Sequence, residues 1–418
     1  MRILHTSDWH LGRNLEGRSR LPEQEQFIDE LVDIVTREDI QIILVAGDVF
    51  DTYNPSAEAE NLFYDTLERL SDNGKRAVVA IAGNHDSPDR LHAANPLALR
   101  HGISLLGYPA EVLPVGMAPG GVKRLLTGPG WMELAVPGCD SKAIIYTLPY
   151  PSESRLNEVF TEKLDEESGQ IAYSERVSRL FNEADQVFRA DTVNLVVAHL
   201  FARGGLESES ERQLGGALAV SPQAMPKGAH YIALGHLHRP QQVNHMPQTC
   251  RYSGSPLSFS FSEADQQKEV VLIDVTPGSL AKTCPINLSC GKALKRWRAS
   301  SLAEARLWLA EPSNLEAWVE LEIMVDQPLE ISELVELRKA HSGIITIRPI
   351  FPELNNDHEA LRRLAEMPLI ERFKLFFERE RGLAPPENLV EFFLEMVNRR
   401  DFDGSGSEPT ESTGGEVA

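Results

Sequence analysis

MRILHTSDWH, residues 1–10, is an apolar, β-branched run that ends in two residues able to bind a metal, Asp8 and His10. The same order recurs in QIILVAGDVFD (41–51), AVVAIAGNHD (77–86), VNLVVAHL (193–200) and AHYIALGHLH (229–238). Short apolar runs of this kind predict buried strands, and ligands of open α/β sheets bind beyond the carboxyl ends of the strands. We therefore expect one sheet edge to collect the polar side chains that follow these strands. They are Asp8, His10, Asp48, Asn84, His199, His236 and His238.

These seven side chains offer enough ligands for two divalent metal ions. Asp8 and His10 alternate on an extended segment, so both can point into one cavity. Asp48 is the best candidate for a bridging ligand, because one carboxylate can give an oxygen to each ion. A mixed nitrogen and oxygen set without thiolate suits Mn, Fe, Zn or Ni better than Mg. Two ions roughly 3.5–4 Å apart can hold a hydroxide nucleophile and clamp phosphoryl oxygens, so the pattern favours a metal-dependent phosphoester hydrolase.

His85 directly follows Asn84 and is expected to face the substrate rather than the metals. An imidazole there could donate a proton to the leaving alkoxide or stabilise the pentacovalent state. We expect Asp86 to orient this ring through its other nitrogen.

Each motif alone has an ordinary structural explanation. A single histidine after a strand is usually a hydrogen-bonded polar residue, and a Gly-Asp or GNHD sequence is often a turn. Five such motifs in this order are hard to obtain by chance, so we interpret them together as one site. The other histidines and the four cysteines lack this placement and are assigned to ordinary packing.

The composition is that of an ordinary soluble protein. The 418 residues include 41 basic and 62 acidic side chains, a formal net charge of −21. This acidic excess argues against a protein that coats nucleic acid by itself, but bound cations and a local basic patch can offset it in a nuclease. Four cysteines without a CxxC pair favour a reduced, intracellular chain. The N-terminus enters a strand at once rather than forming a signal peptide, and no apolar run reaches the roughly 18–20 residues that span a bilayer. We expect a cytoplasmic protein with no membrane partner.

The order of patterns predicts a layered α/β domain followed by smaller parts. Helical stripes are expected over residues 21–39, 55–74 and 153–190, with a hairpin or loop excursion over 109–140. Residues 284–355 offer a second α/β module: helices over 301–311 and 330–341, and strands over 317–325 and 344–351. Amphipathic segments follow, and the polar end of the chain is expected to be disordered. The expected boundaries are 1–280, 281–356, 357–400 and 401–418.

The motifs resemble those of the calcineurin-like metallophosphoesterases and, more narrowly, the SbcD family, the bacterial counterpart of the Mre nucleases. HTSDWHLGR (5–13), VAGDVFDTYNPS (45–56), AGNHDSPDRL (82–91), YIALGHLHRPQ (231–241) and YSGSPLSFSFSE (252–263) carry this resemblance. It covers roughly residues 1–270 motif by motif. It implies a metallophosphoesterase sandwich with a small α/β capping domain and a C-terminal helical hairpin.

The resemblance also implies the roles of the site residues. One metal would be held by Asp8, His10, Asp48 and His238. The other would be held by Asp48, Asn84, His199 and His236. His85 matches the catalytic histidine of the family. Asp51 stands where archaeal relatives carry a histidine, so a role for a second histidine at this position does not carry over.

The implied activity is that of a nuclease subunit in DNA repair, recombination and replication. The family uses two ions, usually Mn²⁺, for 3′–5′ exonuclease cleavage of duplex DNA and endonuclease cleavage of single strands and hairpins. Its partner is an SbcC-type, SMC-like ATPase, with which a homodimer of the nuclease forms a heterotetramer. The two early helices would pair between subunits, although their stripes fit packing within one chain equally well.

The remaining segments also fit this resemblance. The capping module would seat DNA through its basic residues, although a solvated charged face explains each of them as well. These residues are Lys292, Lys295, Arg296, Arg298, Arg338, Lys339 and Arg348. Residues 203–216 would form a loop near the site. The hairpin exposes more aromatic surface than it can bury, which favours a partner groove over packing on its own domain. Its apolar residues are Leu369, Phe373, Phe376, Phe377, Leu389, Phe392, Phe393 and Met396.

Two other functions fit some of these features. A phosphodiesterase of the same superfamily that acts on small phosphoesters would use the same metal ligands, but it would not need the capping module and the hairpin. A scaffold that only bridges the ATPase would tolerate lost ligands, yet every expected ligand and His85 are present.

Overall fold

The computed structural model describes residues 1–156, 166–208, 211, 218–244, 246, 248–351, 367, 369–386, 389–390 and 393. The chain divides into two compact units, Met1–Leu294 and Lys295–Ala418. No helix among these described residues is long and apolar enough to cross a bilayer.

The first unit contains a six-stranded sheet that starts with the N-terminal strand. Its order is β18 (Lys282–Asn287), β17 (Glu269–Asp274), β1 (Arg2–Thr6), β4 (Ile42–Val45), β5 (Ala77–Ile81) and β6 (Ile103–Leu106). Strands β1, β4, β5 and β6 run parallel to one another. Strand β17 pairs antiparallel with β1, and β18 pairs antiparallel with β17. Residues 42–45 and 77–81 are buried throughout, as expected for parallel strands that are covered on both faces.

A second, eight-stranded sheet supplies the other strand ends of interest. Its order is β15 (Gln241–Gln242), β16 (Thr249–Tyr252), β14 (Tyr231–Gly235), β11 (Thr192–His199), β10 (Lys142–Leu148), β9 (Trp131–Ala135), β8 (Lys123–Gly128) and β7 (Gly116–Met117). Strands β16, β14, β11 and β10 run parallel to their neighbours in this group. Strands β7, β8 and β9 form the antiparallel excursion expected over residues 109–140.

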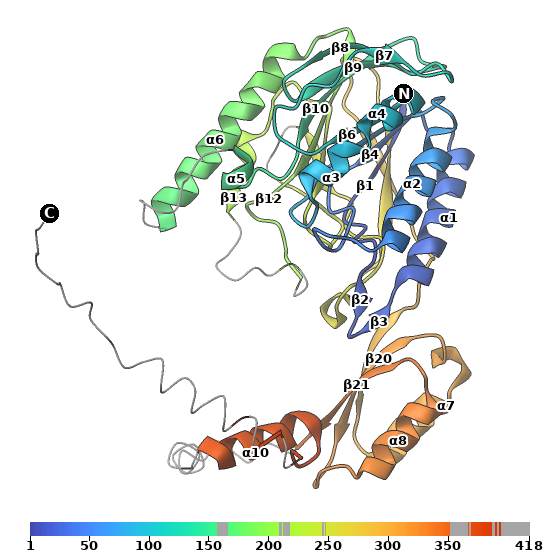
Figure 1. The fold of residues 1–418 in the computed structure, drawn as a ribbon, viewed down its shortest axis with the longest axis vertical. Helices are drawn as coiled ribbons and strands as arrows, with labels where there is room; N and C mark the ends of the chain where they lie inside the picture. Colours follow the sequence, from blue (N-terminus) through green and yellow to red (C-terminus); the bar gives the residue numbers. More distant parts are fainter. Residues whose placement is uncertain are drawn as a thin grey trace, which may run out of the picture. The chain divides into compact units, whose positions relative to one another are not determined.

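The two sheets pack face to face between helices, which gives four layers (Figure 1). One apolar cluster joins the sheets and contains Ile3 and Leu44 from the first and Ile145 and Leu195 from the second. Helices α1 (Leu21–Arg37) and α2 (Ala57–Ser71) cover the first sheet, and α6 (Glu166–Val187) covers the second. The layered α/β fold and the helices expected over residues 21–39 and 55–74 are thus confirmed.

Short elements complete the first unit. They are β2 (Asn14–Leu15), β3 (Arg18–Ser19), α3 (Pro88–Ala93), α4 (Asn95–Ala98), η1 (Leu99–His101), α5 (Glu153–Leu156), β12 (Phe201–Ala202), β13 (Ala219–Val220), η2 (Pro222–Ala224) and η3 (Phe261–Glu263). The helical stretch expected over 153–190 contains α5 and α6, and residues 157–165 between them lie outside the described residues.

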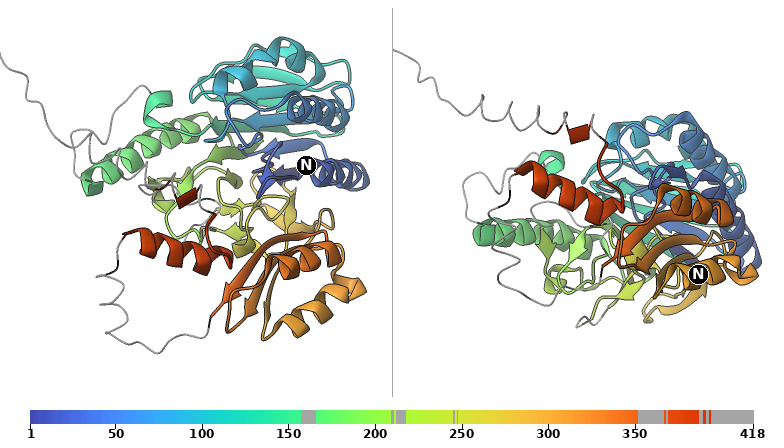
Figure 2. Two further views of the ribbon diagram at one scale, coloured as in Figure 1. Left: turned by 60° about the horizontal axis from the view of Figure 1, so that its bottom comes forward. Right: turned by 90° about the horizontal axis from the view of Figure 1, so that it is seen from below.

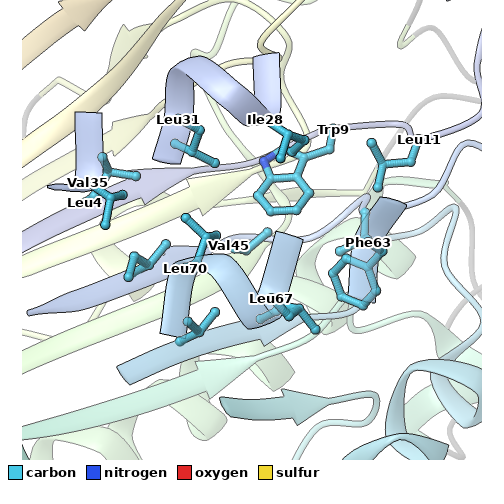
Figure 3. Close-up of a cluster of buried hydrophobic side chains, with 14 of the residues drawn as sticks. Leu4, Trp9, Leu11, Ile28, Leu31, Val35, Val45, Phe63, Leu67 and Leu70 are labelled. Carbon is cyan, nitrogen blue, oxygen red and sulfur yellow. The ribbon is translucent and has the colours of Figure 1, made fainter. Parts of the chain in front are cut away.

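The core beneath α1 and α2 is built around two aromatic rings, Trp9 and Phe63 (Figure 3). Their ring centroids lie 6.3 Å apart in an edge-to-face arrangement. Phe63 also packs against Phe50, at 5.2 Å between centroids. Because Trp9 lies between the ligand candidates Asp8 and His10, this core fixes the backbone from which both of them project.

Replacing Phe63 by alanine is expected to lower the free energy of unfolding of the first unit by about 3–5 kcal/mol, because it opens a cavity in a fully buried cluster. The neighbouring Tyr64 is 41% exposed, so Tyr64→Ala is the matched control and should cost less than about 1 kcal/mol. Urea unfolding followed by circular dichroism measures both. Equal losses for the two variants would contradict this assignment of the core.

The boundary expected after residue 280 is too early. Strand β18 pairs with β17 along its whole length: Asn287 lies opposite Glu269 at one end, and Lys282 lies opposite Asp274 at the other. Residues 281–294 therefore belong to the first unit. The sequence pattern missed β18 because it is an edge strand whose residues are mostly exposed, and it therefore carries no apolar run.

The second unit has a three-stranded sheet of β19 (Leu294–Ala299), β20 (Trp318–Met324) and β21 (Ile344–Ile350). Helices α7 (Leu302–Ala310) and α8 (Ile331–Ala340) lie together against one side of it, as Figure 2 shows, with η4 (Pro312–Asn314) after α7. These helices and strands match the elements expected in the capping module, except that β19 was not foreseen.

A buried carboxylate holds two of the basic residues expected to contact phosphate. Glu320 is 3% exposed, pairs closely with Arg296 and lies 3.1 Å from the guanidinium of Arg348. The charge on these two arginines is therefore partly neutralised within the unit.

Helix α10 (Leu369–Arg381) contacts β21 and begins the C-terminal hairpin. Phe373 stacks on Phe393, with ring centroids 4.1 Å apart and an interplanar angle of 7°. Phe376 remains 62% exposed. Phe392 and Met396 of the expected hairpin, and the whole of the expected tail, lie outside the described residues.

Candidate metal centre

The structure brings all seven strand-end residues together, but from two sheets rather than from the single edge expected. In the first sheet, Asp8 and His10 follow β1, Asp48 follows β4, and Asn84 follows β5. Strands β11 and β14 of the second sheet supply His199, His236 and His238. The ligand atoms of Asp8, His10 and His238 lie within 4.8 Å of one another, as do those of Asp8, Asp48 and His199. The sequence predicted the convergence, but not the pairing of two sheet edges.

Three glycines permit this close approach, each directly before a ligand candidate. A Cβ atom at Gly47 would overlap the ring of His199, and one at Gly83 would overlap the carboxylate of Asp48. A Cβ atom at Gly235 would overlap a backbone carbonyl oxygen of the segment after β4. Packing between the two sheets therefore requires the glycines of the "GD" and "GH" pairs, and packing between the neighbouring ends of β4 and β5 requires that of the "GN" pair.

The backbone at the site is strained. Four of the seven residues have positive φ angles: Asp8 (54°), His10 (45°), Asp48 (49°) and His236 (107°). Such conformations cost roughly 1–3 kcal/mol each for residues other than glycine, and they concentrate at functional sites. Surrounding hydrogen bonds hold them here: the Asp8 amide donates to the Gly47 carbonyl at 2.9 Å, and the His10 amide donates to the Asp48 carbonyl at 3.0 Å.

Asp48 lies between the two groups of imidazoles. Its Oδ2 atom is 3.6 Å from Nε2 of His10 and 3.6 Å from Nε2 of His199. Its Oδ1 atom accepts the backbone N–H of His85 at 2.9 Å. Burial alone would raise the pKa of Asp48, but the His199 and His10 imidazoles hold it well below its usual range. This position is the one required of a ligand shared by two cations.

The pair His10 and His238 forms the first half of the site. Their Nε2 atoms are 3.0 Å apart. Nδ1 of His10 lies 3.5 Å from Asp51, and Nδ1 of His238 lies 3.6 Å from Glu263. Carboxylates favour a hydrogen on each Nδ1, which leaves two Nε2 lone pairs facing each other. That contact is repulsive unless a cation accepts both lone pairs, so the donor set fits a metal ion.

The second half of the site repeats this arrangement. Nδ1 of His199 donates to the Ala46 carbonyl at 2.8 Å, so its Nε2 carries the lone pair, and this atom is 2.9 Å from Oδ1 of Asn84. Nδ1 of His236 is 3.0 Å from the same amide oxygen, and the His236 ring stacks on Tyr150. Two acceptor atoms, Nε2 of His199 and Oδ1 of Asn84, and a ring nitrogen of His236 converge on one place, as ligands of a cation would.

The charge balance of the site also fits bound cations. Burial lowers the pKa values of His236 and His238 to about 3, so these rings are neutral ligands at neutral pH. Burial and the neighbouring Asp48 carboxylate raise the pKa of Asp8 well above its usual range. A divalent cation between Asp8 and Asp48 would allow both carboxylates to ionise.

A buried ionic network behind His238 was not foreseen from the sequence. Lys268 Nζ donates to the His238 carbonyl at 2.9 Å and to Glu263 Oε2 at 2.6 Å. Glu211 accepts the backbone N–H groups of Ser208 and His238. Glu263 ends the stretch YSGSPLSFSFSE, so the signal was present as a motif, but spacing alone gave no reason to connect it with His238.

Replacing Glu263 by glutamine is expected to weaken Mn²⁺ binding by about 10- to 100-fold, because the carboxylate fixes the tautomer and basicity of His238. Activity should return at high Mn²⁺ concentration. Titration of Mn²⁺ by calorimetry and by phosphodiester cleavage measures the shift. Wild-type Mn²⁺ affinity in a folded variant would contradict this role.

Two further variants control the Glu263 experiment. Glu263→Gln leaves the Lys268 cation without its carboxylate, which itself destabilises a protein interior. The double variant Glu263→Gln/Lys268→Met removes both charges and should still bind Mn²⁺ weakly. Glu133 is also buried and ion-paired, with Lys142 and Arg189 on the second sheet, and Glu133→Gln should leave Mn²⁺ affinity unchanged.

His85 lies beside the metal centre, with its ring centroid 4.8 Å from that of His10. The expectation that Asp86 orients this ring is wrong. Nδ1 of His85 is 2.8 Å from the backbone carbonyl oxygen of Asp51, whereas the Asp86 carboxylate accepts the N–H groups of Gly83, Val49 and Phe50. Nδ1 of His85 therefore carries a hydrogen, and Nε2 is the atom available for proton transfer.

Comparison with known proteins agrees with this geometry. The family model for calcineurin-like phosphoesterases matches residues 1–240. The chain is 45% identical over 402 residues to the SbcD protein of the SbcCD nuclease of Bacillus subtilis (strain 168), and the match covers 95% of this chain and 98% of that relative. It is 35% identical over 298 residues to the SbcD protein of the SbcCD nuclease of Rhodobacter capsulatus, and this match covers 68% and 69% of the two chains.

Two packed sheets whose strand ends carry carboxylate, amide and imidazole groups thus define a calcineurin-like phosphoesterase, a metal-dependent phosphodiesterase. Within that class, the chain belongs to the SbcD family of nucleases. The family resemblance inferred from the five motifs is confirmed.

Proposed function

We propose that this protein is the nuclease subunit that cleaves DNA with two Mn²⁺ ions, in complex with an SbcC-type ATPase. The observation that carries the proposal is the position of Asp48, 3.6 Å from an imidazole nitrogen of each half of the site. Asp8, His10, Asp48 and His238 would hold one ion. Asp48, Asn84, His199 and His236 would hold the other.

The residues of the chain divide the work of phosphodiester cleavage. Two divalent ions held by these residues would supply the Lewis acidity that activates a water molecule and neutralises charge on the phosphoryl oxygens. His85 donates a proton from Nε2 to the departing alkoxide, while Nδ1 stays bonded to the Asp51 carbonyl. Asp48 also fixes the backbone at His85 through its Oδ1 atom, so the proton donor and the shared ligand keep a constant spacing.

The choice of Mn²⁺ rests on the ligand types. Four of the seven side chains are imidazoles, one is a neutral amide and two are carboxylates. Mg²⁺ prefers oxygen ligands and retained water, whereas Mn²⁺ accepts nitrogen and oxygen together. The absence of cysteine from this set disfavours a thiolate-bound zinc site.

The second unit and the hairpin support a DNA substrate and a protein partner. Lys295, Arg298, Arg338 and Lys339 are candidate phosphate contacts on the capping unit. Exposed Phe376 and Leu375 on α10 suit a groove on the ATPase. We infer the cytoplasm as the compartment, since all four cysteines are free thiols. The proposal of two copies of each subunit in the complex rests on the family resemblance alone.

The test is Mn²⁺-dependent cleavage of an end-labelled DNA hairpin by the purified protein, with and without its ATPase partner and ATP. Diphenyl phosphate serves as the small-ester control, and chelated protein as the metal control. Hairpin cleavage that requires Mn²⁺ would support the proposal. Ester hydrolysis without DNA cleavage, even with partner and ATP present, would favour a small-substrate phosphodiesterase instead.

A further inference from the structure

A segment that supplies no expected metal ligand holds the loop that carries Asn84 and His85. This segment runs from Tyr150, after β10, to Arg155 on α5. The Tyr150 amide donates to the Ala82 carbonyl at 2.9 Å. The Arg155 guanidinium donates to the Gly83 carbonyl at 2.9 Å and to the Asp86 carbonyl at 2.7 Å. Three carbonyl groups of the AGNHD loop thus accept hydrogen bonds from one short stretch of chain.

The two carbonyls bound by Arg155 flank the residues that matter. Gly83 precedes Asn84, and Asp86 follows His85. One planar guanidinium therefore connects the backbone on either side of Asn84 and His85. Lysine cannot make this bridge, because its ammonium group is a single point charge without the fixed fork of arginine. The carboxylate of Asp86 fastens the other side of the loop to the backbone of Val49 and Phe50.

Tyr150 connects this bridge to the metal centre. Its ring stacks on that of His236, with an interplanar angle of 25° and 6.1 Å between centroids. It meets the His199 ring edge-on at 6.0 Å. The Arg155 guanidinium lies 5.7 Å from the centroid of the same tyrosine ring. Arg155 is therefore fixed relative to the ligands of the second metal as well as to the loop.

We infer that Arg155 is a positioning residue for His85 in phosphodiester cleavage. Its bridge holds the backbone of residues 83–86 so that the His85 imidazole meets the leaving group. The inference rests on the proposed function in one respect, the role of His85 as proton donor. Misplacing a proton donor slows the step in which the leaving group departs, and leaves metal binding and substrate binding intact.

The experiment compares Arg155→Lys and Arg155→Gln with the wild-type protein on two small esters, diphenyl phosphate and bis(p-nitrophenyl) phosphate. Phenol is the poorer leaving group and depends more on a proton donor. We expect kcat for diphenyl phosphate to fall about 10- to 100-fold in both variants. The loss for the nitrophenyl ester should be several-fold smaller, with KM and Mn²⁺ affinity unchanged in both cases.

A double-mutant cycle with His85→Ala separates positioning from other roles. In the His85→Ala background, Arg155→Gln should cost little further kcat on diphenyl phosphate, because the group that it positions is gone. Arg76→Gln is the matched control: Arg76 also donates to a backbone carbonyl, that of Leu70, and it lies in the turn between α2 and β5. This control should leave both ester activities at the wild-type level.

Several results would overturn the inference. A raised KM that Arg155→Lys restores would make Arg155 a phosphate contact. Weaker Mn²⁺ binding, with kcat recovered at high Mn²⁺, would mean that it serves Asn84 instead. Independent, multiplying losses in the cycle, or equal losses on both esters, would also contradict it. The ester assays do not require DNA cleavage, so failure of the proposed DNA substrate would be recognised separately.

Discussion

Replacing Asp48 by asparagine is expected to reduce phosphodiester cleavage by roughly 10³-fold or more and to lower the bound Mn²⁺ from two ions per chain to one or none. A pair of ions contributes several kcal/mol of transition-state stabilisation, and each 1.4 kcal/mol corresponds to about tenfold in rate. Oδ2 of Asp48 lies 3.6 Å from an imidazole nitrogen of each half, that of His10 and that of His199. An amide has one acceptor atom in place of two and no charge.

The measurement combines metal analysis of the purified variant with hairpin cleavage over a range of Mn²⁺ concentrations. Asp274→Asn is the matched control, because Asp274 ends strand β17 of the same sheet and its side chain, paired with Arg2, is half exposed. This control should retain two ions and full activity. Two ions bound to Asp48→Asn with wild-type affinity would exclude Asp48 as the shared ligand.

The sequence predicted which residues converge because of a property of strands. A buried strand needs an uninterrupted apolar run, so the first polar residues after it mark the sheet edge. Asp8, Asp48, Asn84 and His199 were found in this way. The same pattern cannot show which strands share a sheet. Strands β5 and β11 lie in different sheets, yet both are buried apolar runs and look alike in the sequence. For this reason one edge was expected where two sheets meet.

The residues that the sequence missed have partners far away in the chain. Arg155 acts on carbonyl groups 69 and 72 positions earlier. Glu263 faces a histidine 25 positions earlier, through a network that burial makes possible. His85 was found, but its orienting partner is the backbone carbonyl of Asp51, and a carbonyl group is present at every residue. Side-chain chemistry is visible in a sequence, whereas backbone acceptors are not.

Replacing His85 by alanine is expected to reduce cleavage of DNA by about 10²- to 10⁴-fold, the range attributed to general acid catalysis. Bound Mn²⁺ should stay at two ions per chain, because His85 is not among the seven converging ligands. The loss should depend on the leaving group. DNA releases an alkoxide, which needs a proton, so its cleavage should suffer most. Cleavage of bis(p-nitrophenyl) phosphate should suffer least, because nitrophenolate leaves without one.

This dependence on the leaving group distinguishes His85 from a residue that only supports the fold. A structural defect would slow all esters by the same factor, and loss of a metal would be reversed by adding Mn²⁺. His101 offers a matched control, since it lies on η1, away from the metal centre. Among the described residues, its side chain makes no hydrogen bond or ring contact with a ligand candidate. His101→Ala should cleave every substrate at the wild-type rate. If His85→Ala reduced the rates of cleavage of DNA and of the nitrophenyl ester by the same factor, the proton would come from another group. The hydrogen bond between Asp48 and the His85 backbone would then serve only to position the metal ligands.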